Sequence, residues 1–231
     1  REIPLIEIQH HHAHIASCMA ENNWPLDAGR VLGVALDGTG WGPDGTVWGG
    51  EFMACDYRSY ERLGQFKPVA LPGGEQAVRQ PWRNAYAHIR AEMGWAEFAM
   101  NFADLDIFKY LNESHQETRM PYIEPLGAWR AMLGDLVVGT PIGTISARFH
   151  RGLASVIVQM VAKLSGSDRK FETIALSGGC FQNRTLFQLV HDQLQFLGYR
   201  VLSHSQIPAN DGGLSLGQAV IAAASLQPSP Q

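Results

Sequence analysis

The chain has 231 residues, with 45% apolar and 17% charged residues, which favours a globular protein with a sizeable core over bulk disorder. Its net charge of −4 weighs against a surface for nucleic acid. The three cysteines have no paired spacing, which argues against a disulfide framework or a zinc finger and fits a reducing compartment. We therefore expect a cytoplasmic protein with neither a signal peptide nor a membrane span. Because the chain opens without Met, we expect it to be part of a longer protein.

Apolar periodicity and turn residues predict the elements of the first part of the chain. In chain order they are a strand over 3–8, a helix over 9–22, a hairpin with strands over 31–36 and 47–54 around a glycine-rich turn at 37–45, a strand over 61–66, and helices over 75–93 and 95–111.

The second part follows a weakly patterned, proline-marked stretch. Its predicted elements are helices over 126–136 and 145–164, a strand over 171–176, a Gly-Gly turn into a helix over 181–197, a strand over 199–203, and a turn over 210–213 that leads into a last helix up to 224. This order predicts an α/β protein with mixed sheets and a ligand cleft between lobes. The expected domains are a first lobe over 1–111, a linker or deletion scar over 112–125, a second lobe over 126–226 and a frayed tail over 227–231.

The run His10-His11-His12-Ala13-His14 is the most informative local feature. On a helix, His10 and His14 project from one face and could bind one metal ion. His11 and His12 point elsewhere and are expected to support the site or to lie on the surface. The alternative is a polar patch at a helix start, or a tag remnant.

Asp37 ends a predicted buried strand and is followed by Gly38-Thr39-Gly40. A carboxylate in this position could bind a metal, and the glycine backbone could approach a phosphate. An ordinary hairpin turn explains the same residues.

Gly178 and Gly179 lie between a strand and a helix, where backbone N–H groups and the helix dipole favour an anion. Tight strand–helix packing is the alternative reason for these glycines. Cys180 follows them, and we expect a small buried residue rather than a nucleophile.

Asp211 precedes the last predicted helix, so it could be a simple N-cap. Since ligands bind at strand ends in α/β proteins, it is also a candidate metal ligand.

Taken in order, these segments resemble the C-terminal carbamoyltransferase (TsaD-like) domain of the [NiFe]-hydrogenase maturation factor HypF. The resemblance covers nearly the whole chain. The residues that carry it are His10-His11-His12-Ala13-His14-Ile15-Ala16-Ser17, Leu36-Asp37-Gly38-Thr39-Gly40-Trp41-Gly42, Trp48-Gly49-Gly50-Glu51, Leu71-Pro72-Gly73-Gly74, Pro81-Trp82-Arg83-Asn84-Ala85, Ile145-Ser146-Ala147-Arg148-Phe149-His150 and the two later glycine segments.

The resemblance implies the fold of actin-like ATPases and sugar kinases (the ASKHA type), with two lobes and a nucleotide cleft. It implies a single Fe2+ or Zn2+ ion, with Mg2+ as a further candidate cofactor, and ATP or carbamoyl-adenylate as the nucleotide. In that family a carbamoyl group passes from the adenylate to the C-terminal cysteine of HypE, for cyanide-ligand synthesis. The implied catalytic and metal residues are His10, His14, Asp37 and Asp211, and the implied nucleotide residues are Gly38, Thr39, Gly40, Gly178, Gly179 and Asn183.

The chain departs from the family pattern in one region. The family carries a Gly-Arg-Leu-Phe-Asp-Ala and a Tyr-Glu-Gly stretch before the helix at Ile145, and neither is found here. They should lie near residues 112–124, so we expect an incomplete fold and an altered nucleoside pocket.

Three alternatives stay open. A TsaD-like tRNA threonylcarbamoyltransferase is disfavoured by the net charge and by Asp37, which the TsaD family lacks. A non-catalytic metal- or nucleotide-binding fragment would bind metal without transfer. A zinc hydrolase would need a carboxylate base near the metal, whereas His11 follows the first histidine.

Overall fold

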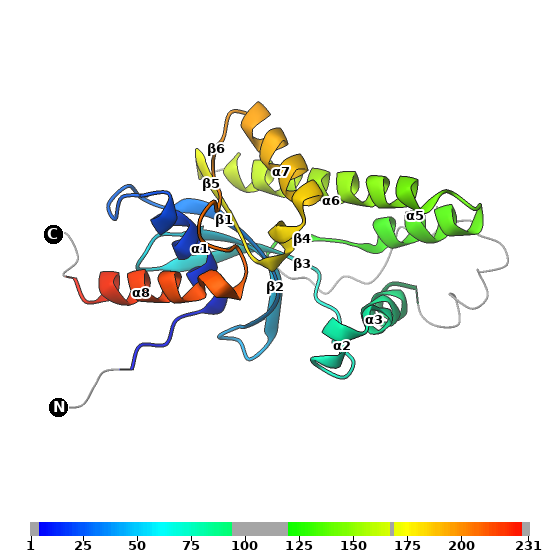
Figure 1. Ribbon diagram of the computed structural model, residues 1–231, viewed down its shortest axis with the longest axis horizontal. Coiled ribbons are helices and arrows are strands. Elements are labelled where there is room, and N and C mark those ends of the chain that lie inside the picture. The colour runs from blue at the N-terminus through cyan, green and yellow to red at the C-terminus, as the bar shows by residue number, and fades with distance from the viewer. Residues whose placement is uncertain (1–4, 94–119, 167–168, 228–231) are drawn as a thin grey trace. The chain divides into compact units, whose positions relative to one another are not determined.

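The computed structural model describes residues 5–93, 120–166 and 169–227 (Figure 1). They fall into two compact units: unit 1 takes its residues from 1–65 and 154–231, and unit 2 from 66–153. The expected lobe boundaries at 111 and 126 do not coincide with this partition, because β1 and β5 of unit 1 pair in one sheet.

The sheet of unit 1 has the strand order β3-β2-β1-β5-β6. β1 (Val31–Trp41) and β2 (Val47–Cys55) pair antiparallel, as do β2 and β3 (Tyr60–Phe66). On the other side, β5 (Thr173–Ser177) runs parallel to β1, and β6 (Arg200–Leu202) parallel to β5. The parallel pairing places the carboxyl-terminal parts of β1 and β5 at the same edge of the sheet, where ligands bind in α/β proteins.

Helix α1 (His10–Glu21) packs between the sheet and α8 (Leu214–Ser225), which lies beside it in Figure 1. Its apolar residues, from Ile15 to Met19, join the core with Val31 and Ala35 of the sheet. The contact of the two helices is close at Gly217, where a Cβ would overlap the backbone of Ala13.

Unit 1 also contains α7 (Arg184–Phe196) and two short 3-10 helices, η1 (Gly179–Gln182) and η2 (Asp211–Gly213). Each 3-10 helix follows the loop after a parallel strand, η1 after β5 and η2 after β6. The two later glycine segments, at 178–179 and 212–213, therefore lie where the chain passes from a strand into a helix.

Unit 2 contains α2 (Gln76–Arg79), α3 (Pro81–Met93), β4 (Tyr122–Ile123), α5 (Leu126–Val137) and the first part of α6 (Ile142–Ser165). β4 is tied to the start of the unit by the Lys67 N–H, which donates to the Ile123 carbonyl at 3.0 Å. Among the described helices, in both units, we find none that combines the length and apolarity a membrane span requires.

Most predicted elements are confirmed, with four corrections. Residues 5–8 form no strand, and β1 runs on to Trp41 where a turn from Asp37 was expected. The helix predicted over 75–93 breaks at Gln80, because a residue before proline disfavours the α conformation. The helix predicted from Phe181 begins at Arg184, after η1. The helix predicted over 95–111 and the first part of the expected linker lie outside the described residues.

Candidate metal centre

Helix α1 presents two imidazoles from its first turns. Gln9 caps the helix, its side-chain oxygen accepting a hydrogen bond from the His12 backbone N–H at 2.7 Å. His10 and His14, one turn apart, then lie on the same face with ring centroids 4.9 Å apart. The His14 side chain is only 1% exposed and that of His10 is 21% exposed.

Asp37 reaches the histidines because β1 bulges where it carries this residue. The pairing with β2 passes from Leu36 opposite Gly50 directly to Gly40 opposite Trp48, so three residues of β1 face one of β2. Such bulges change the direction in which a side chain points. The alternative of an ordinary hairpin turn at Asp37 is therefore wrong, and the carboxylate lies 2.9 Å from His10 Nε2.

Asp211 comes from the far end of the chain and lies in η2. The N-cap role considered for it belongs to Asn210, whose side chain accepts from the Gly212 N–H at 3.0 Å. The Asp211 carboxylate lies instead 3.3 Å from His10 Nε2 and 3.4 Å from His14 Nε2.

These four side chains offer two imidazole nitrogens and two carboxylate oxygens, all within 4.8 Å of one another. A tetrahedral cation with ligands at about 2.1 Å would separate its ligand atoms by about 3.4 Å. The histidine–aspartate distances, from 2.9 to 3.7 Å, lie on both sides of that value. In addition, His14 Nε2 is buried and makes no hydrogen bond with any of the described residues, although buried polar atoms normally make one. The donor set and this orphaned nitrogen both fit a divalent metal.

The electrostatics of the cluster favour bound positive charge. The hydrogen bond to Asp37, together with the charge of Asp211, raises the pKa of His10 despite its partial burial. Burial opposes ionisation of Asp37, but the hydrogen bond with His10 and the neighbouring His14 ring hold the pKa of its carboxyl well below the usual range. The Gly179 N–H also donates to Asp37, at 3.3 Å. An anionic carboxylate is the form that binds a cation.

His11 and His12 are both buried, so the possibility that they lie on the surface is wrong. His11 Nε2 donates to the Gly49 carbonyl at 2.9 Å, and His12 Nε2 donates to the Asp56 carbonyl at 2.7 Å. Burial lowers the pKa of His11 to about 4, so its ring is neutral at pH 7. Both histidines therefore fix α1 to β2 and the turn after it.

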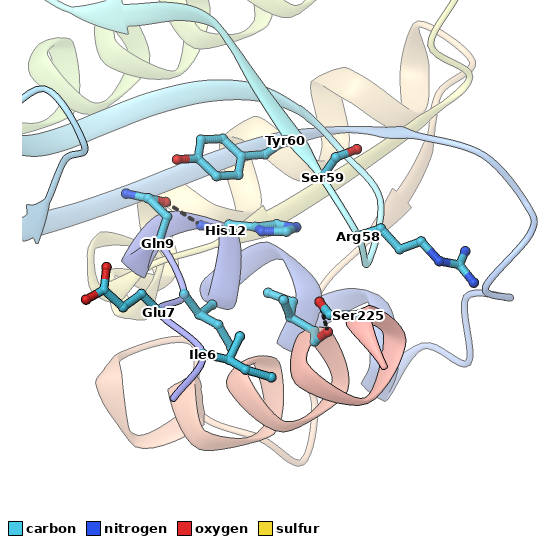
Figure 2. Close-up of a pocket in the computed structure, with 10 residues that line it drawn as sticks. Ile6, Glu7, Gln9, His12, Arg58, Ser59, Tyr60 and Ser225 are labelled. Carbon is cyan, nitrogen blue, oxygen red and sulfur yellow. Dashed lines mark hydrogen bonds between the residues drawn. The ribbon is translucent and has the colours of Figure 1, made fainter. Parts of the chain in front are cut away.

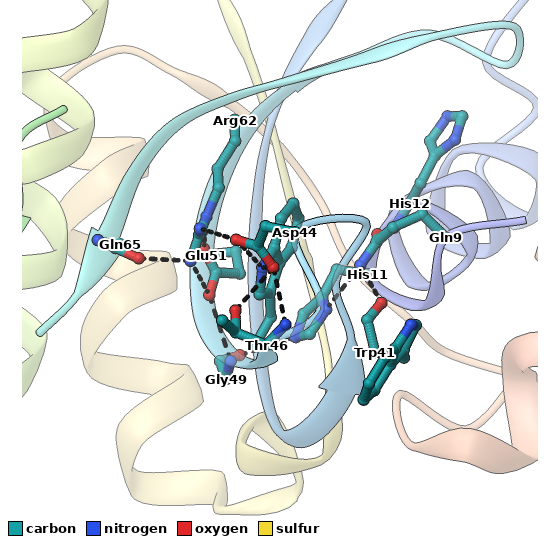
Figure 3. Close-up of polar contacts among 11 residues, drawn as sticks. Gln9, His11, His12, Trp41, Asp44, Thr46, Gly49, Glu51, Arg62 and Gln65 are labelled. Carbon is teal, nitrogen blue, oxygen red and sulfur yellow. Dashed lines mark hydrogen bonds and ion pairs between the residues drawn. The ribbon is translucent and has the colours of Figure 1, made fainter. Parts of the chain in front are cut away.

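A buried ion pair supports the same hairpin from its other side (Figure 3). Glu51, 2% exposed, accepts from Arg62 Nε at 2.6 Å, and the Arg62 guanidinium lies 4.0 Å from the centre of the Trp48 ring. Glu51 also accepts from the Gly49 N–H at 3.2 Å. The Gly49 peptide is thus held by Glu51 through its N–H and by His11 through its carbonyl.

The residues expected to bind nucleotide lie around Asp37. Gly38 and Thr39 are exposed in the bulge, whereas Gly40 is buried. A Cβ at Gly40 would overlap the rings of His11 and His10, so this position requires glycine. Gly178 has φ 103°, and a Cβ would overlap the backbone of Leu36. Gly40 and Gly178 are therefore required by packing in any case.

The structure adds a helix-capping role for Asn183 and corrects the expected burial of Cys180. The Asn183 side chain caps α7, accepting from the Leu186 N–H at 3.1 Å. Cys180 is exposed, not buried as expected. Even so, desolvation of its thiol and the nearby Asp37 carboxylate raise its pKa, which disfavours the thiolate that a nucleophile needs.

A pocket of about 320 Å3 lies elsewhere in unit 1, beside the start of α1 (Figure 2). Its lining includes Glu7, His12, Arg58 and Tyr60, and none of the four clustered ligand candidates. It is separate from the candidate metal centre.

A second polar cluster, which no sequence motif indicated, joins the end of α1 to β5. Glu21 at the end of α1 contacts His204, which contacts Ser177 at the end of β5. One signal was available: Glu21 is an acidic residue in the last turn of a helix, where the helix dipole favours a basic one.

Comparison with known proteins identifies the family. Residues 33–119 and 105–218 match the model "Carbamoyltransferase, Kae1-like Domain, second subdomain", and residues 1–21 match "HypF Kae1-like domain". Among curated relatives, carbamoyltransferase HypF of Rhodobacter capsulatus is 34% identical, over 97% of this chain and 36% of its own. A HypF homolog of Cupriavidus necator is 28% identical, over 96% of this chain and 71% of its own.

Solved structures agree. A full-length HypF, described as phosphate- and nucleotide-bound, superposes with a TM-score of 0.81 at 32% identity, over 99% of this chain and 44% of its own. HypF of T. kodakarensis has a TM-score of 0.77 at 22% identity, over 97% of this chain and 37% of its own, and so supports the fold alone. The predicted α/β fold class is confirmed.

The chain spans about a third of the length of the Rhodobacter relative. The alignment of the two proteins runs over 273 positions, whereas this chain has 231 residues, so the relative carries residues in this region that this chain lacks. The family matches and the superposition together show that this chain belongs to the HypF family and corresponds to its Kae1-like carbamoyltransferase domain.

Proposed function

We propose that this domain transfers a carbamoyl group from carbamoyl-adenylate to the C-terminal cysteine thiol of a HypE-like acceptor protein, in cyanide-ligand synthesis for [NiFe]-hydrogenase. The observation that carries the proposal is the convergence of His10, His14, Asp37 and Asp211 within 4.8 Å, next to the point where the parallel pairing of β1 with β5 ends. The name of the family, and the phosphate and nucleotide described for a solved relative, support the reaction class and the nucleotide.

The four clustered side chains would hold one Fe2+ or Zn2+ ion, since two imidazoles and two carboxylates suit either metal. When bound, such an ion would act as a Lewis acid toward the carbamoyl carbonyl oxygen. The buried position of His14 and the hydrogen bond from Gly179 to Asp37 keep these ligands in place before the substrate arrives.

The glycine turns would bind the phosphate of the adenylate. Gly38 and Thr39 lie outside the ladder register in the bulge, and Gly179 follows the turn at Gly178. Backbone N–H groups in such turns can donate to phosphate oxygens, including the oxygen that becomes negative as AMP leaves. Asp37 connects the two glycine segments, because it lies in the bulge with Gly38 and accepts a hydrogen bond from the Gly179 N–H. The phosphate would therefore lie next to the metal ligands.

The transfer needs no nucleophile from this chain. The acceptor thiolate attacks the carbamoyl carbon and forms the C–S bond, the C–O bond to the adenylate phosphate breaks, and AMP leaves with the electron pair. The thiol proton passes to solvent. Cys18 and Cys55 are fully buried and burial raises the pKa of both, and the raised pKa of Cys180 disfavours its thiolate.

The test supplies carbamoyl phosphate, ATP and a peptide that ends in the acceptor cysteine. A full-length HypF, in which alanine replaces the two histidines that align with His10 and His14, would supply the adenylate. Adding this chain loaded with Fe2+ or Zn2+ should produce peptide heavier by one carbamoyl group in the mass spectrum. His14→Ala should remove the product and Cys180→Ser should not. Equal product with the wild-type chain and His14→Ala, or none with either, would contradict the proposal.

A further inference from the structure

Glu21 closes the helix that carries His10 and His14, in an electrostatically unfavourable place. A carboxylate at the carboxyl end of a helix faces the negative end of the helix dipole. The Glu21 side chain is nevertheless only 7% exposed. A buried charge in such a place requires partners elsewhere, and they come from the loop between β6 and η2.

The Glu21 carboxylate binds four consecutive residues of that loop. Oε1 accepts from Ser205 N and Ser205 Oγ, both at 2.8 Å, from Ile207 N at 3.3 Å, and from the Gln206 N–H. Oε2 accepts from His204 Nδ1 at 2.9 Å. Charged acceptors make the stronger hydrogen bonds, so this carboxylate fixes the backbone of the loop to the end of α1.

His204 extends the contact to β5. Since its Nδ1–H donates to Glu21, a neutral ring leaves Nε2 as an acceptor for the Ser177 hydroxyl, 2.8 Å away. Burial lowers the pKa of His204, although Glu21 opposes this, in keeping with a neutral ring. The order of hydroxyl, imidazole and carboxylate resembles that of a hydrolase, but Ser177 is fully buried and cannot reach a substrate. The contacts among Glu21, His204 and Ser177 therefore stabilise the structure and take no part in catalysis.

The loop so fixed leads directly into Asp211. The carbonyl of Ala209, two residues before Asp211, accepts from the Gly178 N–H at 2.9 Å, and that of Ser203 accepts from Asn22 Nδ2 at 2.9 Å. Asp211 is the most exposed of the four ligand candidates, with a 69% exposed side chain, so little packing holds the side chain itself. Its position relative to the histidines depends on the backbone that carries it.

We propose that Glu21, acting through His204 and the loop over 204–207, is a positioning residue that holds the Asp211 carboxylate against His10 and His14. This inference rests on the proposed metal centre. It predicts that Glu21 affects metal binding only through Asp211.

A double-mutant cycle tests this with Co2+ as the probe, read by its visible absorption and by its dissociation constant. The proteins are the wild-type chain, Glu21→Gln, Asp211→Asn and the double variant. Asp56→Asn is the matched control, because Asp56 also accepts from consecutive backbone N–H groups, those of Arg58 and Ser59, each at 2.7 Å, in a turn without a candidate ligand. We expect Glu21→Gln to weaken Co2+ binding by about 10- to 100-fold, with a spectrum close to that of Asp211→Asn. In the Asp211→Asn background, Glu21→Gln should change the dissociation constant less than about 2-fold.

The outcomes separate the two proposals. If the wild-type chain binds no Co2+, or binds it equally well after His14→Ala, the metal centre itself is wrong. If the wild-type chain binds Co2+ through His14 but Glu21→Gln weakens binding equally in both backgrounds, or no more than Asp56→Asn does, Glu21 does not position Asp211.

Discussion

Gly217→Ala should show how tightly the metal centre depends on the contact between α1 and α8. A Cβ at Gly217 would overlap the carbonyl group and Cα of Ala13, which are backbone atoms that cannot rotate away. Replacing glycine by alanine inside a helix stabilises by about 0.5–1 kcal/mol, whereas overpacking costs about 1–3 kcal/mol. Because backbone opposes backbone, we expect the upper end of the cost, about 3 kcal/mol, and so a net loss of about 2–2.5 kcal/mol.

Gly152→Ala is the matched control. It makes the same substitution in α6, where the added Cβ would have no atom of the described residues within 4 Å apart from its chain neighbours and the helix's own backbone, and it should stabilise by about 0.5–1 kcal/mol. The midpoint of urea unfolding, measured for both variants without metal, gives the comparison. As α8 begins directly after η2, Gly217→Ala should also weaken Co2+ binding. If Gly217→Ala were as stabilising as Gly152→Ala, the close approach of α1 and α8 would be refuted.

Three further predictions concern other parts of unit 1. Burial opposes ionisation of Glu21, but hydrogen bonds from Gln206 and Ser205 lower its pKa from 4.5 to about 2, so stability should fall as pH drops through that window. The loss should be about 2 kcal/mol after allowance for solvent screening, and Glu21→Gln should flatten the dependence in acid titrations followed by circular dichroism. Arg62→Ala leaves the buried Glu51 carboxylate unpaired and should cost about 3 kcal/mol in urea unfolding at pH 7. Cys180, whose thiol has a raised pKa, should react with iodoacetamide more slowly at pH 7 than free cysteine.

Each of these has a contrary result. A pH dependence unchanged by Glu21→Gln would show that other groups produce it. A cost for Arg62→Ala below about 0.5 kcal/mol would mean that Glu51 is not desolvated as the structure shows. Alkylation of Cys180 faster than that of free cysteine would restore it as a candidate nucleophile.

The sequence singles out His10, His14, Asp37 and Asp211 as candidate ligands because each has a local signal, and the structure brings the four side chains together. Histidines one turn apart share a helix face, and both aspartates stand beside glycines that follow predicted strands. What the sequence could not show is the bulge that re-aims Asp37, since a bulge depends on the register of two strands. The choice between an N-cap and a ligand for Asp211 likewise needed the position of Asn210.

Long-range polar contacts were the main omission. Glu21 and His204 are 183 positions apart, and no periodicity links them. Glu51 and Arg62 pair across neighbouring strands, and a single charge in an apolar strand was the only sign of that pair. The burial of His11 depends on the close packing of α1 against β1, which glycine at position 40 permits. Such contacts become visible only once the strand order and the helix packing are known.

The most direct test of the central claim is anomalous diffraction from crystals of the chain loaded with iron or zinc, recorded at the absorption edge of the metal. The account predicts one metal peak per chain, at about 2.0–2.2 Å from His10 Nε2, His14 Nε2 and a carboxylate oxygen of both Asp37 and Asp211. A peak bound elsewhere, or a fully occupied site that excludes His14 or Asp211, would contradict it.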